Sequence, residues 1–138
     1  MVAWRETASD LAQSDLDGLL DEALTVAEQR LTEHGQLVPF GLVVDRKGTT
    51  QLITAEAAGA TQSLALGTAA IGAMRSRIRA AALVVDVRLP DTGGDGVEVF
   101  LEHAEGIALT VLEPYRLEGE NLSVSPLEAS TAQRRIWR

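Results

Sequence analysis

The chain contains no cysteine, and this absence excludes three kinds of chemistry at once. Disulfide bonds, thiolate zinc sites and cysteine nucleophiles all require the missing thiol. A chain without disulfides suits a reducing compartment. We therefore expect a cytoplasmic protein whose stability depends on a hydrophobic core.

Long apolar runs and aromatic residues are scarce as well. No stretch of about 18 apolar residues is present, so we expect no membrane-spanning helix. The first residues lack the basic and apolar segments of a secretory signal. Aromatic residues make up only 4% of the chain, which leaves few platforms on which sugars or nucleobases could stack.

Basic residues are outnumbered, with 12 Lys and Arg against 20 Asp and Glu and a formal net charge of −8. Nucleic-acid binding draws its affinity from clustered cations, so we expect neither nucleic acid nor a membrane as partner. Two small basic clusters stand out. We interpret residues 75–79 as complementing the dipole of a helix end, and residues 134–138 as part of a terminal tail.

A chain of 138 residues can bury roughly two thirds of its unfolded surface, which is enough for one domain. No linker, repeat or low-complexity block divides it. We interpret residues 1–138 as a single domain. It has a flexible N-terminal arm (1–13), a core (14–113) and an irregular C-terminal segment (114–138).

Helical periodicity predicts two helices. The first begins with Ser14 as N-cap and ends at Gly35, with leucines and alanines at three- and four-residue spacing. The second runs from Ser63 to about Arg79 and is rich in alanine and glycine. Between them, residues 40–45 and 51–54 flank a turn at Arg46-Lys47-Gly48, which is typical of a β-hairpin.

The second half predicts a β-meander of strands at residues 82–89, 97–103 and 107–113. A short further strand around residues 122–124 is an alternative to irregular chain. Apolar alternation and turn chemistry set the expected pairs. These are Leu89 opposite Val97, Arg88 opposite Glu98, His103 opposite Ile107, and Leu101 opposite Leu109.

The predicted fold class is α+β, in the order α-β-β-α-β-β-β. We expect a two-layer sandwich with one antiparallel sheet of about five strands and both helices on one face. Over residues 14–113 this succession is similar to that of roadblock and profilin-like domains, and the resemblance implies a small dimerising scaffold or adaptor. The resemblance depends on the order of the elements alone, because no signature residues of these families are present. A proline-containing segment stands where a roadblock domain has its C-terminal helix.

The chain has two histidines, and His103 is the more interesting one because carboxylates surround it in the sequence. No nucleophile, second histidine or phosphate-binding loop converges on the same place. We therefore assign no catalytic, metal-binding or cofactor-binding residue and expect no cofactor. We retain one speculative polar cluster, which comprises Asp86, Glu98, Glu102 and His103.

The second face of the predicted sheet is too apolar to lie open to water, and such a patch usually marks an interface. A two-fold dimer would bury it through Val84, Phe100, Thr110 and Leu112. The alternative is that the tail from Leu117 to Trp137 folds back across this face.

These observations favour a non-enzymatic protein-interaction or scaffold domain that forms a homodimer and has a possible protein partner. One alternative is a small-ligand-binding module with a pocket between the second helix and the sheet, where Gly67 and Gly72 leave room. A third is a hydrolase-type enzyme that uses His103 with Glu102 or Asp86.

Overall fold

The computed structural model describes residues 4–54 and 59–138, which form three helices and seven strands. In chain order they are α1 (Trp4–Thr7), α2 (Asp10–His34), β1 (Phe40–Asp45), β2 (Thr50–Thr54), α3 (Ala60–Met74), β3 (Ile78–Arg88), β4 (Asp95–His103), β5 (Ile107–Glu118), β6 (Asn121–Val124) and β7 (Glu128–Thr131). The α+β class with one antiparallel sheet is confirmed. The described residues form more strands than predicted, because residues 114–138 contribute strands of their own.

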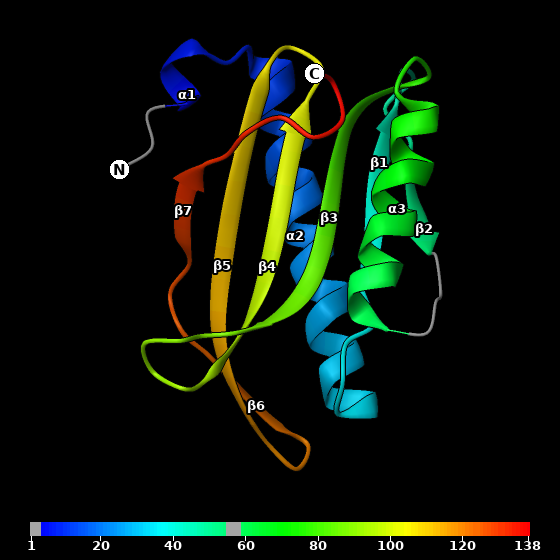
Figure 1. The fold of residues 1–138 in the computed structure, drawn as a ribbon. Coiled ribbons are helices and arrows are strands. Elements are labelled where there is room, and N and C mark those ends of the chain that lie inside the picture. Colours follow the sequence, from blue (N-terminus) through cyan, green and yellow to red (C-terminus); the bar gives the residue numbers. More distant parts are fainter. Residues whose placement is uncertain (1–3, 55–58) are drawn as a thin grey trace.

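The sheet has the order β2-β1-β3-β4-β5-β6, and β7 pairs with β5 as well (Figure 1). All of its pairings are antiparallel. The predicted hairpin of β1 and β2 is present, as is the meander of β3, β4 and β5. Figure 1 shows α2 behind the sheet and α3 in front of it, over β1 and beside β2.

The two main helices therefore lie on opposite faces, and the prediction that both cover one face is wrong. The register between β3 and β4 explains the difference. Asp86 lies opposite Val97, where Leu89 was expected. A shift by an odd number of residues turns every side chain of a strand to the other face. The loop closes early, since the Leu89 N–H donates to the Gly94 carbonyl at 2.8 Å.

The register between β4 and β5 is as predicted. His103 lies opposite Ile107, and Leu101 lies opposite Leu109. The turn between these strands places Gly106 at a φ of 106°, a left-handed conformation that side chains disfavour. Glycine at that position therefore fixes the pairing.

Two hydrophobic cores result, one on each face of the sheet. Alternate residues of β3 and β4 face α2 and form the larger core, which includes Leu16, Leu19, Val84, Val97, Val99 and Leu101. The remaining residues face α3 and the C-terminal segment. They form the smaller core, which includes Val43, Ile71, Leu83, Phe100, Ala108 and Ile136.

Helix α2 starts earlier than predicted, because Ser9 and not Ser14 is the N-cap. The Ser9 hydroxyl accepts the Ala12 N–H at 3.0 Å. Gly35 ends the helix as expected, with a φ of 71° and its N–H bonded to the Leu31 carbonyl. Part of the predicted N-terminal arm is thus helical, and Trp4 of α1 packs against the larger core.

Strand β5 continues through Pro114 to Glu118, although the proline was expected to end it or to place it at an edge. The Pro114 carbonyl accepts the Ser125 N–H at 2.8 Å on the side away from β4. The nitrogen of a strand residue points the same way as its carbonyl, so the missing N–H costs no bond to β4. Helix α3 ends at Met74 because Ile78 and Arg79 already belong to β3.

Candidate functional site

A buried polar network joins α2, β3 and β4 at one end of the sheet. Asp15 of α2 receives two hydrogen bonds from the Arg79 guanidinium, at 2.9 and 3.0 Å. Its Oδ2 also lies 2.9 Å from Nε2 of His103, at the end of β4. Asp15 and His103 are almost fully buried, while Arg79 keeps partial access to solvent. A paired and hydrogen-bonded carboxylate of this kind is compatible with burial.

The geometry of His103 leaves it no free ring nitrogen. Its Nδ1 accepts the Glu105 N–H at 3.2 Å, so the ring proton resides on Nε2 and is donated to Asp15. The nearby Ser9 hydroxyl donates to a Glu105 carboxylate oxygen at 2.6 Å and not to the histidine. A general base needs an open lone pair and a nucleophile within reach. This network is therefore a structural one.

Glu102 lies on the opposite face of β4 and holds the C-terminal segment. Its carboxylate is fully buried and accepts the backbone N–H groups of Arg135, Ile136 and Trp137 at 2.8 to 2.9 Å. Ile136 fills the smaller core beside Phe100. Three N–H donors stabilise the charged carboxylate in place of a cation. Glu102 thus anchors the tail across one end of the sheet, where the segment passes in front of β4 and β5 (Figure 1).

The tail also contacts the surrounding elements through its own side chains. The Arg135 guanidinium carbon lies 4.2 Å from the centre of the Phe100 ring. The Trp137 indole N–H donates to the Arg75 carbonyl at 3.2 Å. These contacts agree with the alternative in which the tail folds back over the second face of the sheet. The tail covers part of that face.

A pair of carboxyl groups lies between α2 and β5. Burial and a hydrogen bond with Glu28 raise the pKa of Glu113 to about 7. Glu113 is buried, and its Oε1 has no hydrogen-bond partner among the described residues. A neutral Glu113 can donate its proton to the Glu28 carboxylate, so the pair tolerates burial while it retains one proton.

Tyr115 and Asp86 form a second polar contact on the face of α2. The Tyr115 hydroxyl donates to Asp86 Oδ1 at 2.8 Å. Burial raises the pKa of Asp86, and burial together with this bond raises the pKa of Tyr115. Both groups therefore favour their neutral forms more than free side chains do.

The structure does not bring the speculative cluster together. Glu98 and Glu102 lie on the face of α3, whereas Asp86 and His103 lie on the face of α2, near opposite ends of the β3–β4 pairing. The alternation of residues along the strand placed Glu102 among polar side chains. Its partners in the structure are backbone N–H groups more than 30 positions away. No side-chain pattern marks such acceptors. Asp15 and Arg79 were missed because each also suits an ordinary helix end.

The four residues expected at a dimer interface do not share one face. Val84 is fully buried beneath α2, and Phe100 is 1% exposed on the opposite face. Thr110 and Leu112 are partly exposed there and line a groove of about 500 Å³ between the β3–β4 loop and β7. Of the four residues, only Thr110 and Leu112 are accessible to a partner in a single chain.

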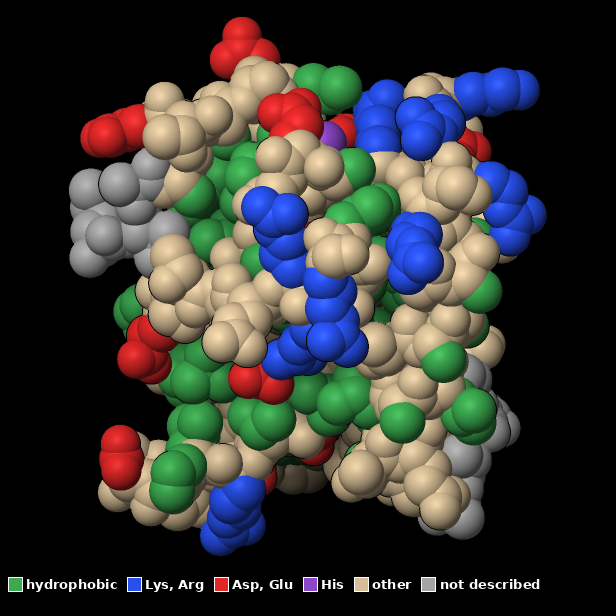
Figure 2. Space-filling view, turned by 45° about the horizontal axis from the view of Figure 1, so that its top comes forward, with side chains coloured by type: hydrophobic (Ala, Val, Ile, Leu, Met, Phe, Trp, Pro, Cys, Tyr) green, Lys and Arg blue, Asp and Glu red, His purple; other side chains and the backbone are tan. Residues whose placement is uncertain are grey.

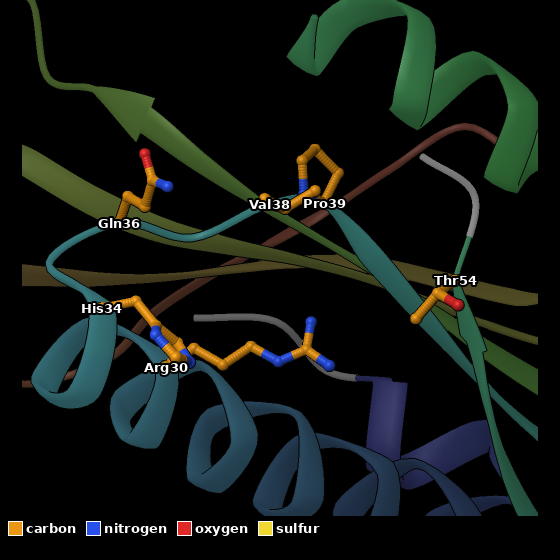
Figure 3. Close-up of a pocket in the computed structure, with 6 residues that line it drawn as sticks. All are labelled: Arg30, His34, Gln36, Val38, Pro39 and Thr54. Atoms are coloured by element: carbon orange, nitrogen blue, oxygen red, sulfur yellow. The ribbon is translucent and has the colours of Figure 1, made fainter. Parts of the chain in front are cut away.

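The pocket expected between α3 and the sheet is too small for a ligand. The cavity beside Leu64 and Gly67 measures about 10 Å³, which is at most the room that one water needs. A larger hollow of about 270 Å³ opens between the end of α2 and β2. Figure 3 shows its lining residues: Arg30, His34, Gln36, Val38, Pro39 and Thr54.

The hollow in Figure 3 does not gather reactive groups. The Arg30 side chain extends along it towards Thr54, and its guanidinium carbon lies 4.9 Å from the centre of the Phe40 ring. His34 is largely exposed at the helix end. An active site needs convergent polar groups in a sheltered place, whereas the histidine of this hollow is exposed to solvent and its arginine lies over an aromatic ring.

Within residues 4–54 and 59–138, no three His, Asp or Glu side chains are placed to hold a metal ion. No helix in the described part of the chain is both long and apolar enough to cross a membrane. Comparisons with protein-family models, curated proteins and solved structures found no match to this chain.

Proposed function

We propose that the protein is a non-enzymatic interaction domain that associates with a second copy of itself through α3 and β2. The observation that carries this proposal is the absence of charge from this surface. Helix α3 has 15 residues and β2 has 5, and none of them is Asp, Glu, Lys or Arg. Charged residues make up 23% of the whole chain, so several would be expected in an ordinary exposed surface of this length.

The outer side of α3 is apolar and composed mainly of small residues. Leu66 is 50% exposed. Its exposed neighbours along the helix are Gln62, Ala65, Ala69, Ala70 and Ala73. Surface helices normally carry polar or charged residues on the side that faces water. Small side chains allow another backbone to approach closely, which supports packing against a second helix.

Strand β2 adds an open edge beside this helix. It pairs with β1 on one side, and no other described strand pairs with it. Natural edge strands are usually protected from pairing with other chains by charges, prolines or bulges. The sequence of β2 has neither a charge nor a proline, and Leu52 is 43% exposed.

A second copy of the chain suits this surface better than an unrelated partner. A two-fold interface brings a surface against itself, so a charge close to the axis meets its own like charge. The α3–β2 surface avoids that repulsion, although the chain carries a net charge of −8. A two-fold axis beside β2 would pair the two β2 strands antiparallel and place both α3 helices on one face of a continuous sheet. Since Val84 and Phe100 are buried within one chain, the proposal moves the interface away from them.

Light scattering after size exclusion tests the proposal with one substitution and a matched control. Leu66→Glu introduces a charge at the proposed interface, and Leu127→Glu introduces the same charge at a residue of similar exposure elsewhere. We expect the unmodified chain and Leu127→Glu to be dimers. We expect Leu66→Glu to be monomeric over a hundredfold range of concentration, with an unchanged circular dichroism spectrum.

Two results would overturn the proposal. A chain that remains monomeric at every concentration would remove self-association altogether. A dimer that Leu66→Glu leaves as stable as Leu127→Glu does would place the interface on another surface, such as the groove beside Thr110 and Leu112.

A further inference from the structure

Three segments that are distant in the sequence meet at the end of the sheet where the tail crosses. The Arg46 guanidinium, from the β1–β2 turn, donates to the Ser76 carbonyl at 2.9 Å in the α3–β3 connection. The Trp137 indole, from the C-terminal segment, donates to the Arg75 carbonyl in the same connection. These two bonds join the segments, and we call the cations on and beside them the basic corner: Arg46, Lys47, Arg75, Arg77 and Arg138.

No ion pair offsets the charge of the basic corner among the described residues, although the Thr49 N–H, together with the Lys47 charge, lowers the pKa of Asp45. All five side chains are exposed, and none forms an ion pair with an acidic residue that the structure describes. The adjacent carboxylates are engaged elsewhere. Asp15 binds Arg79 and His103, and Glu102 binds the backbone of the tail. The Asp45 carboxylate accepts the N–H groups of Thr49 and Lys47, within its own turn.

Helix capping does not account for this cluster. Arg75 follows directly after α3, where a cation complements the helix dipole. That effect falls off within one turn of the helix. It gives no reason for Arg46 and Lys47 on a hairpin turn, or for Arg138 beside the anchored tail. Figure 2 shows Lys and Arg side chains gathered in its upper right and centre, although the chain as a whole is acidic.

The shape of the surface favours an extended anion. None of the main hollows in the described part of the chain is lined by a residue of the basic corner, so none of them would hold a small phosphate or carboxylate against it. Cations spread over three segments suit a flexible chain that lies across them and pairs with several at once.

The charge of the remaining molecule limits the length of that anion. Without the five cations the chain would carry a formal charge of −13, which is −8 minus 5. A nucleic acid or an anionic bilayer extends beyond the corner and meets this acidic surface within a Debye length of about 8–10 Å. A short segment can stay on the corner. We propose that the basic corner binds a short acidic polypeptide segment of a partner protein.

The test uses the full chain and a fluorescent oligoglutamate peptide of about ten residues, followed by fluorescence anisotropy at low salt. Arg75→Glu with Arg77→Glu reverses two charges in the corner. Arg88→Glu with Arg116→Glu reverses two exposed charges elsewhere and gives the same net charge. Lys47→Glu with Arg138→Glu tests the corner through its two other segments.

We expect both corner pairs to raise the Kd by about tenfold or more, and the control pair to raise it by about twofold or less. All three variants change exposed side chains, and the corner pairs lose only the weak interactions of Arg75 with the helix dipole and of Lys47 with Asp45, so each should unfold within a few degrees of the unmodified chain. Three results would overturn the proposal. The first is that the peptide does not bind. The second is that the corner pairs and the control pair weaken binding equally. The third is that a thymidine oligonucleotide or phosphatidylserine vesicles, at matched charge, bind more tightly than the peptide.

The proposal is independent of self-association. Leu66→Glu alters a helix residue outside the corner, so loss of the dimer in that variant should leave peptide binding intact. Failure of either experiment therefore leaves the other interpretable.

Discussion

The buried carboxylate of Glu102 determines where the last residues of the chain lie. Substitution by alanine would leave three backbone N–H groups without their acceptor and would free the tail. Charge-assisted hydrogen bonds of this kind contribute about 1.5–3 kcal/mol each before relaxation. We expect Glu102→Ala to lower the free energy of unfolding in urea by about 3 kcal/mol and to shift the fluorescence of Trp137 towards that of an exposed indole.

Glu98 provides the matched control for this prediction. It lies on the same strand and the same face, is only partly buried, and makes no described hydrogen bond. We expect Glu98→Ala to change the stability by less than about 0.5 kcal/mol. If both substitutions had the same small effect, the tail would not depend on Glu102.

Glu113 predicts a pH dependence of opposite sign to that of an ordinary ion-paired carboxylate. Its pKa is raised from 4.5 to about 7, so the folded chain holds a proton that the unfolded chain releases. The folded state therefore loses stability as the pH rises from about 4.5 through about 7, by an amount on the order of 2 kcal/mol.

Glu113→Gln removes this titration and keeps a donor for Glu28. We expect the variant to have a higher Tm than the unmodified chain at pH 8 and a similar Tm at pH 5. Glu118→Gln, an exposed change on the same strand, should leave the pH profile unaltered. An equal decline of Tm with pH in Glu113→Gln and in the unmodified chain would assign the decline to other groups.

At the scale of elements, we expect substitution by alanine to have opposite effects on stability at two glycines, Gly67 and Gly41. A Cβ at Gly67 of α3 would meet Leu83 Cδ2 at 4.0 Å, an ordinary contact. Gly67→Ala should therefore stabilise the protein by about 0.5–1 kcal/mol through helix propensity. A Cβ at Gly41 of β1 would meet Ile71 Cδ1 at 2.7 Å and the Ala82 carbonyl at 3.2 Å.

Gly41→Ala should destabilise the protein by about 1–3 kcal/mol, because neither the packed helix nor the neighbouring strand can move freely. Urea unfolding of both variants gives the comparison. A stabilising Gly41→Ala would show that α3 is less closely packed on β1 than the structure has it. The direction of each change depends on contacts across the sheet, which the sequence alone does not reveal.

The elements that follow from local patterns were predictable. The β1–β2 hairpin and the β4–β5 pairing depend on turns at Gly48 and Gly106, both of which have positive φ. The β3–β4 pairing was not predictable, because its loop has several glycines and closes at Leu89 and Gly94. The predicted register decided which side chains were expected on each face of the sheet. The prediction of two helices on one face followed from that assignment.

At the scale of the whole molecule, the candidate surfaces have different origins. The charge-free α3–β2 surface consists of two contiguous sequence segments, so its composition could have been read from the chain. The basic corner draws on three segments, and only the folded structure brings Arg46, Arg75 and Arg138 together. Sequence analysis therefore treated its arginines as separate small clusters.

The basic corner adjoins one end of the α3–β2 surface, since Lys47 lies just before β2 and Arg75 just after α3. Association through α3 and β2 would place two copies side by side, and each copy would keep its own basic corner. Two acidic segments could then bind to one dimer, with the gain in affinity that bivalent binding provides when a linker spans both sites.

The network of Asp15, Arg79 and His103 has a consequence for the order of folding. It joins residues 88 positions apart, whereas each hairpin of the meander joins near neighbours. Closing a long loop costs more chain entropy than closing a short one, so local hairpins form first on average. The complete network needs β3 and β4 side by side, because each strand supplies one of its side chains. Docking of α2 onto the finished meander should therefore be a late event, and variants of Asp15 should speed unfolding more than they slow folding.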